Sequence, residues 1–261
     1  WAAVPAGFRR LRHRLHPPAT SVGPIALDTM ESEDQAWLDY RQRFAGLYDQ
    51  ANYSSPLQAW VMRAGHRLAE KPFGPEKHFG RVLEIGAGTG EHYAFVRHAM
   101  EQYIVSDADP EALAVARRKL GEPSPDRLGF ELQAAEQLSH PQQSFDRVIA
   151  THVLEHINQP HLALKEWRRV VKDGGTLTVL IPTDPGIAWR LARHLGPRRN
   201  AVAQGIAYDY VMAREHVNSC TNLISLLRYY FPSSLEAWWP FPIPSVDLNL
   251  FFAFHAVVRR S

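Results

Sequence analysis

Short apolar runs alternate along the chain with segments of helical periodicity. Four runs have the length of buried strands: residues 81–85, 103–106, 148–150 and 176–181. Three segments between or before them have the spacing of helices: residues 57–69, 91–100 and 160–171. Two further apolar runs, near residues 235–239 and 250–258, close the sequence. Strands that alternate with helices predict an α/β fold built on a mostly parallel sheet.

A long segment separates the strand that ends at Ile181 from the next apolar run near Leu235. Long ordered insertions often cover a binding site, so we expect residues 182–234 to form a lid, with one helix at 222–230. Ser32-Glu33-Asp34 supplies a start for a helix through Tyr48. The predicted organisation is a basic leader (1–30), an N-terminal helical cap (31–79) and a main domain (80–261) that contains the lid.

Composition agrees with a globular enzyme, because 45% of the residues are hydrophobic and 21% are charged. The single cysteine, Cys220, excludes an internal disulfide and favours a reducing compartment. No Cys/His spacing resembles a zinc site, so we expect no metal. Apolar runs are too short for a membrane span, and no signal-peptide core stands near Trp1. We therefore expect a cytoplasmic protein.

The net charge of +2 is too small to indicate a nucleic-acid partner. The positions of the basic residues along the chain are more informative. Near the N-terminus, Phe8, Leu11 and Leu15 form an apolar stripe beside basic residues, as in a helix that contacts a membrane surface or a partner. A solvated arm is the alternative. A second basic cluster suits an anionic acceptor or a solvated face: Arg190, Arg193, His194, Arg198 and Arg199.

The strongest chemical signal is the glycine loop after the first strand, Gly86-Ala87-Gly88-Thr89-Gly90. Glycines adopt backbone angles that side chains forbid and let the backbone approach a ligand closely. Glu91 stands where a dinucleotide-binding motif has its last glycine, so a nicotinamide cofactor is disfavoured. The N-terminus of the predicted 91–100 helix is suited to a carboxylate. An ordinary turn between strand and helix is the alternative interpretation.

Polar residues follow the next strands at the same predicted edge of the sheet. Asp107 ends a strand about twenty residues beyond the glycines, where an acid can accept hydrogen bonds from both ribose hydroxyls. Asp109-Pro110 supplies the cap of the following helix and leaves Asp107 for binding. Thr151 and His152 follow the buried strand 148–150, at the end where open α/β sheets bind ligands.

In this order the segments resemble the class I S-adenosylmethionine-dependent methyltransferases, and most closely the type-11 small-molecule methyltransferases. Glu84, Gly86, Gly88 and Gly90 match the first motif of that family position by position. Residues 144–156 resemble its Ser-Phe-Asp-x-Val-x-x-x-x-Val-Leu-x-His pattern. The resemblance implies a doubly wound, mostly parallel seven-stranded sheet with an antiparallel last strand. It also implies S-adenosyl-L-methionine as cofactor and S-adenosyl-L-homocysteine as product.

The resemblance further implies a set of cofactor-binding residues at the tips of the first four strands. They are Glu84, Gly86, Ala87, Gly88, Gly90, Asp107, Ala108, Ala134, Ala135 and Thr151. The sequence departs from the family at Ala134, where an aspartate often accepts from the adenine amino group. That hydrogen bond needs another acceptor, such as Glu136 or a water molecule.

Methyl transfer needs a general base only when the acceptor carries a proton, and imidazole suits that role. His152, at the strand end, and His216, in the predicted lid, are the candidates, while Tyr208, Arg214 and His216 are expected to contact the acceptor. A small-molecule acceptor is favoured because the 151–156 segment lacks the Asn/Asp-Pro-Pro-aromatic signature of enzymes that methylate base amino groups. A nucleic-acid methyltransferase and a non-catalytic binding module remain as alternatives.

Overall fold

The structure is a computed structural model that describes residues 37–38, 40, 56–121 and 127–260. The predicted basic leader and both ends of the predicted helix from Ser32 to Tyr48 lie outside these residues. The apolar stripe of Phe8, Leu11 and Leu15 lies outside them too.

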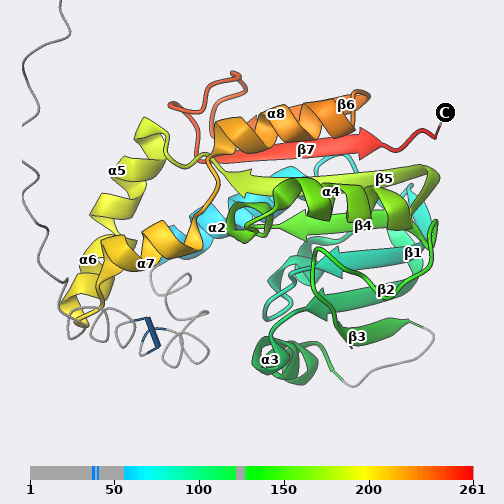
Figure 1. The fold of residues 1–261 in the computed structure, drawn as a ribbon, viewed down its shortest axis with the longest axis horizontal. Helices are drawn as coiled ribbons and strands as arrows, with labels where there is room; N and C mark the ends of the chain where they lie inside the picture. Colours follow the sequence, from blue (N-terminus) through cyan, green and yellow to red (C-terminus); the bar gives the residue numbers. More distant parts are fainter. Residues whose placement is uncertain (1–36, 39, 41–55, 122–126, 261) are drawn as a thin grey trace, which may run out of the picture.

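In the described part of the chain, seven strands form one sheet in the order β3-β2-β1-β4-β5-β7-β6 (Figure 1). Strands β1 to β5 pair in parallel, and β7 runs antiparallel to both β5 and β6. This topology confirms the predicted doubly wound, mostly parallel sheet with an antiparallel last strand. The bounds are β1 (His78–Ile85), β2 (Ala99–Asp107), β3 (Leu128–Leu132), β4 (Phe145–Thr151), β5 (Val171–Pro182), β6 (Ser234–Trp239) and β7 (Phe251–Val257).

Helices cover both faces of the sheet, since alternate residues of its strands pack into different clusters. Phe252 and Phe254 of β7 pack in the core with α4 (Pro160–Val170) and α8 (Cys220–Tyr230). Phe251 and Ala253 pack with α2 (Pro56–Glu70) on the other face. Further along that second face, α3 (Pro110–Leu120) covers β1 and β2. The predicted helices at 57–69, 160–171 and 222–230 are therefore confirmed as α2, α4 and α8.

The helix predicted at residues 91–100 is wrong. Only a short 3-10 helix, η1 (Glu91–Phe95), follows the glycine loop, and Val96 is already extended. Ala99 pairs with His78 of β1, so β2 begins before the apolar run that predicted it. Residues 99 and 100 have a side-chain spacing that also fits a helix, but their backbone pairs with β1 and so becomes part of a strand. As a result, the loop ends in a short helical turn rather than a long helix.

The segment before β6 is helical, and it divides into two parts with different packing (Figure 1). In α5 (Ile187–Leu195) and α6 (Pro197–Ala203) no residue is buried, and α7 (Tyr208–Glu215) buries Val211. By contrast α8 buries Cys220, Leu223, Ile224 and Leu227 against the core. The α8 helix is therefore part of the layer that covers the sheet, although the predicted lid range includes it.

Within the described residues, no helix combines the length and the apolar character needed to cross a bilayer.

Candidate functional site

The glycine loop leaves the carboxyl end of β1 with three residues in the left-handed region. Gly86, Gly88 and Gly90 have φ angles of 63°, 55° and 78°. A Cβ at Gly86 would lie 2.4 Å from Val153 Cγ2, and one at Gly90 would lie 2.7 Å from Leu120 Cδ1. A Cβ at Gly88 would meet nothing within 4 Å. The outer glycines are therefore required by packing within the protein, whereas Gly88 turns bare backbone toward open space.

Asp107, at the end of β2, holds the middle of this loop. Its Oδ2 accepts from Gly88 N at 2.7 Å, and its Oδ1 accepts from Asp109 N at 2.8 Å. Asp109 caps α3 through Glu111 N, as predicted. Burial raises the pKa of Asp107, although the amide hydrogen bonds act in the opposite direction. Each carboxylate oxygen accepts more than one hydrogen bond, so Asp107 can also receive two hydroxyl groups.

Glu84 lies beneath the loop and supports it from within the sheet. Tyr103 Oη donates to Glu84 Oε2 at 2.7 Å, and Ser106 Oγ donates to the Glu84 carbonyl at 2.7 Å. Burial raises the pKa of the Glu84 carboxyl. The side chain is only 1% exposed. Its observed partners therefore lie inside the protein, between β1 and β2.

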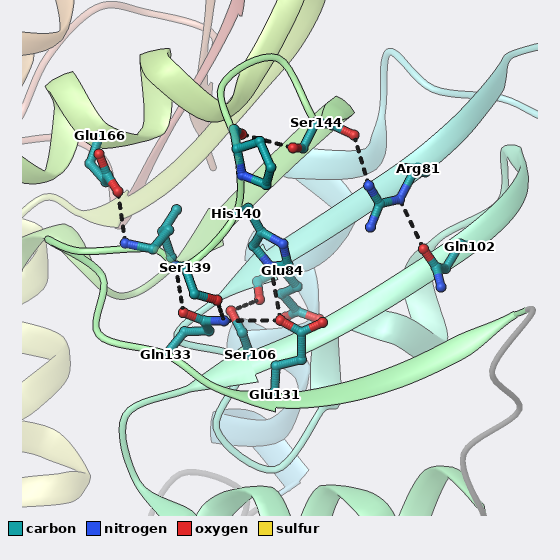
Figure 2. Close-up of polar contacts among 12 residues, drawn as sticks. Arg81, Glu84, Gln102, Ser106, Glu131, Gln133, Ser139, His140, Ser144 and Glu166 are labelled. Atoms are coloured by element: carbon teal, nitrogen blue, oxygen red, sulfur yellow. Dashed lines mark hydrogen bonds and ion pairs between the residues drawn. The ribbon is translucent and has the colours of Figure 1, made fainter.

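The turn after β3 carries the predicted adenine site, and Gln133 organises it (Figure 2). Gln133 N donates to the Asp107 carbonyl at 2.9 Å, and its side-chain oxygen accepts from Ser139 N at 3.0 Å. The carbonyl of Ala135 accepts from Trp167 Nε1 at 2.8 Å. Ala134 is exposed at the tip of the turn. The sequence analysis did not single out Gln133, because a glutamine after a strand carries no signal of its own.

A pocket lies between the glycine loop, η1, α2 and the end of β4. Its lining residues are Met62, His66, Gly86, Ala87, Gly88, Thr89, Glu91, His92, Thr151 and His152. Of the predicted residues, the structure thus brings Gly86, Ala87 and Gly88 together with Thr151 and His152 in one cavity. Glu84 and Gly90 are not among the lining residues. Asp107 adjoins it through its bond to Gly88, while Ala108, Ala134 and Ala135 follow β2 and β3 at the same edge.

His152 has an unusual backbone, with φ of 58°. For a residue with a side chain this angle is costly, and such strain is concentrated at functional sites. Its Nδ1 lies 3.6 Å from Glu155 Oε1, and its ring meets Phe251 edge-on at 5.4 Å. Burial raises the pKa of Glu155, but His152 and His156 outweigh this and lower it overall. Glu155 is therefore a carboxylate that orients the His152 ring.

His216 and Asp184 form a second pair, at the end of β5. The His216 Nδ1 and Asp184 Oδ2 atoms are 2.8 Å apart. Burial raises the pKa of Asp184, but the hydrogen bond and charge of His216 and the charge of Arg193 lower it overall. Since a carboxylate can only accept, Nδ1 of His216 carries the hydrogen, and in the neutral form of the ring Nε2 has a lone pair. This is the arrangement of an oriented general base.

The two histidines stand at opposite ends of an aromatic wall. Ring centroids are 5.4 Å apart for His152 and Phe251, 5.9 Å for Phe251 and Trp189, and 6.5 Å for Trp189 and His216. Phe251 is a strand residue of β7, whereas Trp189 comes from α5. The wall therefore joins the sheet edge to the first helix of the insertion.

The other predicted acceptor residues have partners within the insertion. Tyr208 Oη accepts from Arg193 Nε at 3.1 Å, and Arg214 Nη1 donates to Tyr210 Oη at 3.0 Å. Arg193 and Arg198 of the predicted anion cluster form ion pairs with Asp184 and Asp209. Their positive charge is thus balanced locally, which weakens the case for this cluster as an anion site.

Two charged residues that the sequence analysis missed lie behind the pocket. Arg147 of β4 donates to both carboxylate oxygens of Glu70 of α2, at 3.0 and 2.6 Å. The signal was present in the sequence, because an arginine inside a buried apolar strand needs a partner. Among the described residues, no group of three or more His, Cys, Asp or Glu side chains is placed to hold a metal ion.

Comparison with known proteins matches residues 83–179 to a family described as a methyltransferase domain. A demethylmenaquinone methyltransferase of Bacteroides fragilis is 26% identical over 174 residues, which cover 64% of this chain and 68% of that protein. A phosphatidylethanolamine N-methyltransferase of Cereibacter sphaeroides is 31% identical over 107 residues, which cover 39% of this chain and 50% of that protein. The family match, residues 83–179, contains the glycine loop, Asp107 and His152 but ends before His216.

Solved structures share the fold. A putative S-adenosylmethionine-dependent methyltransferase from Listeria monocytogenes superposes with a TM-score of 0.53 at 15% identity, over 77% of this chain and 99% of that one. The N-methyltransferase NodS from Bradyrhizobium japonicum gives a TM-score of 0.51 at 18% identity, over 77% and 97% of the two chains.

Proposed function

We propose that this chain, which belongs to the class I S-adenosylmethionine-dependent methyltransferases, transfers a methyl group to a small-molecule acceptor and leaves S-adenosyl-L-homocysteine as product. One observation carries the proposal. Gly88 turns bare backbone toward open space while its amide is tied to Asp107, and the adjoining pocket continues to Thr151 and His152. The loop is thus arranged for close contact with a ligand that reaches from the tip of β2 to the tip of β4.

The residues at this edge fit S-adenosylmethionine. Asp107 would accept hydrogen bonds from the ribose hydroxyls, and the turn at Ala134 and Ala135 would lie against the adenine. The loop from Gly86 to Gly90 would contact the methionine portion. When bound, the cofactor supplies an electrophilic methyl group on a sulfonium. The protein's contribution is to align the acceptor with that methyl group, an effect worth roughly 7 kcal/mol or more in well-oriented reactions.

We place the acceptor against the aromatic wall of Phe251 and Trp189, between His152 and His216. Aromatic side chains provide large apolar contact at fixed geometry and suit a small acceptor with a planar or apolar part. His216 is the better oriented base. Its Nδ1 lies 2.8 Å from Asp184 Oδ2, which holds the ring in place and leaves Nε2 to accept a proton. His152 is the second candidate, and its carboxylate partner is more distant at 3.6 Å.

The helices α5 to α7 are proposed to act as a lid over this acceptor site. Trp189 lies in α5, and His216 directly follows α7. Movement of α5 to α7 would therefore open or close the aromatic wall. Few of their residues are buried, which suits elements that move. Bound cofactor and acceptor should slow amide exchange in α5 to α7 while α8 stays unchanged.

Calorimetry with S-adenosylmethionine tests the cofactor site directly. We expect the wild-type chain to bind, and Asp107→Asn to weaken binding about tenfold or more, since hydrogen bonds to a charged group are worth about 1.5–3 kcal/mol. Asp173→Asn is the matched control, because Asp173 is exposed and bonds Arg260 N away from the site. No binding by the wild-type chain would favour a non-catalytic module and contradict the proposal.

The acceptor class is tested by incubating pooled metabolites with methyl-labelled cofactor and identifying labelled products by mass spectrometry. His216→Gln should lower the rate of methyl transfer by roughly 10²–10⁴ for an acceptor that must lose a proton. Cofactor affinity should stay unchanged in that variant. Labelled RNA or DNA without a labelled small molecule would move the assignment to a nucleic-acid methyltransferase.

A further inference from the structure

The helix α5 is amphipathic, but its apolar stripe faces outward. Ile187, Leu191 and Leu195 follow one another at intervals of four residues, so they lie on the same face of the helix. Their exposed fractions are 58%, 58% and 74%. A surface helix normally turns such a stripe toward the core. In α5 this orientation is reversed.

The opposite face of α5 attaches the helix to the rest of the protein. Trp189 packs with the apolar cluster of β7 and α2, and its ring centroid lies 5.9 Å from that of Phe251. One turn further along the same face, Arg193 Nη1 donates to Asp184 Oδ2 at 3.0 Å. These contacts hold the helix in place without the stripe. Packing within the described part of the chain therefore does not account for the three apolar side chains.

The loop between β6 and β7 lies beside the start of α5 (Figure 1). The Asp247 carbonyl accepts from Ala188 N at 2.9 Å, and Asp247 Oδ1 accepts from Ile187 N at 3.3 Å. The backbones are so close that a Cβ at Gly186 would lie 2.1 Å from the carbonyl oxygen of Val246. The loop and the helix therefore adjoin directly and contribute to one surface.

This loop also exposes apolar side chains, and a buried asparagine holds it in shape. Phe241, Ile243 and Leu248 are each about half exposed. The buried Asn249 accepts from Phe241 N through Oδ1 at 2.8 Å, and its Nδ2 donates to the carbonyls of Ile243 and Ser245 at 2.8 and 2.9 Å. Each polar atom of the buried amide group thus bonds within the loop. The three apolar side chains are therefore presented from a fixed backbone.

Positive charge borders the apolar stripe. Residues 185–208 contain four arginines and no acidic residue. Two of these arginines form ion pairs with the aspartates on either side of the segment. The other two, Arg190 of α5 and Arg199 of α6, are exposed, and neither has an ion-pair partner among the described residues. Their charge is therefore available to an anionic partner.

We propose that α5 and the loop at residues 240–250 form a docking surface for an anionic lipid bilayer. An apolar helix face bordered by arginines is typical of a helix that lies in a membrane interface. The apolar side chains would enter the outer acyl region, and Arg190 and Arg199 would contact lipid phosphates. Trp189 of the aromatic wall lies on the opposite face of α5. Docking would therefore bring the proposed acceptor site within about one helix diameter of the lipid, roughly 10 Å.

This inference goes beyond the proposed function and can be tested without cofactor. A fluorophore on the stripe reports whether α5 enters lipid. Cys220 is the single cysteine of the chain and is buried, so Leu191→Cys can be labelled selectively with nitrobenzoxadiazole. Vesicles of phosphatidylcholine and phosphatidylglycerol in equal parts should shift its emission to the blue. Lipids that carry a quencher on the acyl chain should then quench it.

Leu235→Cys is the matched control for this label. Leu235 is as exposed as Leu191, but it lies at the end of β6 remote from the loop, so its label should show neither change. Unchanged emission at position 191 would overturn the inference, even if the chain bound the vesicles through another segment.

Substitution tests the contribution of the apolar side chains. The double variant Leu191→Gln and Leu195→Gln should bind the same vesicles about tenfold or more weakly, because two large side chains no longer enter the acyl region. Vesicle cosedimentation at increasing lipid concentration measures the affinity. Leu235→Gln should bind like the wild-type chain. Thermal unfolding should be unchanged in these variants, since all three positions are exposed. Wild-type affinity in the double variant would contradict the inference.

The arginines test the anionic character of the surface. Arg190→Gln and Arg199→Gln should each weaken binding to the mixed vesicles about fivefold. On vesicles of phosphatidylcholine alone, these variants and the wild-type chain should bind equally and more weakly. Equal affinity of the wild-type chain for the two kinds of vesicle would contradict the proposed partner.

A second copy of the chain is the other occupant that would cover this surface. Light scattering in the absence of lipid measures the mass of the wild-type chain and of Leu191→Gln. We expect the same mass for both. A wild-type dimer that Leu191→Gln dissociates would assign the surface to self-association and overturn the inference.

Discussion

At the scale of single residues, the loop from Gly86 to Gly90 depends on glycines for two separate reasons. Gly86 and Gly90 have neighbours so close that a methyl group would collide with Val153 or Leu120. Gly88 has no such neighbour and instead leaves its backbone open. The same motif therefore combines positions that packing requires with one that we propose serves binding, and substitution can separate the two.

Alanine at three glycines with positive φ should give three different results. Gly174 has φ of 75° and no neighbour within 4 Å, so Gly174→Ala adds backbone strain alone, about 1 kcal/mol. Gly88→Ala adds similar strain and should also weaken cofactor binding. Gly86→Ala adds a clash with Val153 and should cost about 3 kcal/mol or more of the free energy of unfolding.

Chemical denaturation measures stability in this series, and calorimetry measures cofactor affinity. Unchanged affinity in Gly88→Ala would show that the ligand does not approach the loop backbone there. Gly174→Ala is the control, because Gly174 lies near the start of β5 and is not among the residues that line the pocket.

At the scale of elements, α2 is joined to the sheet by more than apolar contact. The helix packs on β5, β6 and β7, and its last residue, Glu70, pairs with Arg147 of β4. Both charges are buried, and the Arg147 guanidinium lies 3.8 Å from the centre of the Phe73 ring. The pair fixes where α2 ends relative to the pocket, and so places His66.

Breaking this pair on one side only should be more harmful than removing it. Glu70→Met or Arg147→Met leaves a buried charge without its partner and should cost about 3–5 kcal/mol of the free energy of unfolding. The double variant should be more stable than the sum of the two losses predicts, and denaturation of all four proteins measures the coupling.

The exposed pair of Arg198 and Asp209 is the matched control, and the same cycle there should give almost no coupling. Additive losses at Glu70 and Arg147 would show that the two charges are stabilised independently of each other.

At the scale of the whole molecule, the buried histidines should make stability depend on pH. Burial, followed by the charge of Arg147, lowers the pKa of His255 from 6.5 to about 4. The unfolded chain takes up this proton near pH 6.5, whereas the folded chain does so only near pH 4. The contribution of His255 to the free energy of unfolding is therefore complete above pH 6.5. About 3 kcal/mol of it is lost as the pH falls toward 4.

Denaturation curves between pH 7.5 and 4.5 test this dependence. His255→Gln, which does not titrate, should flatten the fall in the free energy of unfolding at acidic pH, whatever its stability at neutral pH. His161→Gln is the control, since His161 is exposed on α4, and its curve should keep the wild-type slope. An unchanged slope in His255→Gln would contradict the assigned pKa.

The sequence by itself determined the alternation of strands and helices, and the glycine loop and the acid that follow β1 and β2. Each of these depends on neighbours along the chain: a strand followed by Gly86 and Gly88, an acid at the end of the next strand, and a proline that starts α3. Local patterns of this kind dictate backbone geometry directly, because the residues involved are within a few positions of one another.

Only the tertiary structure decided which side chains meet. The helix predicted at 91–100 yields to strand pairing with β1, a contact that no local pattern contains. His66 and His92 come from different elements, as do Asp184 and His216, and each pair forms only after the helices pack on the sheet. A hydrogen bond between residues far apart in the sequence depends on how the whole backbone folds. The spacing of residues along the chain therefore does not predict it.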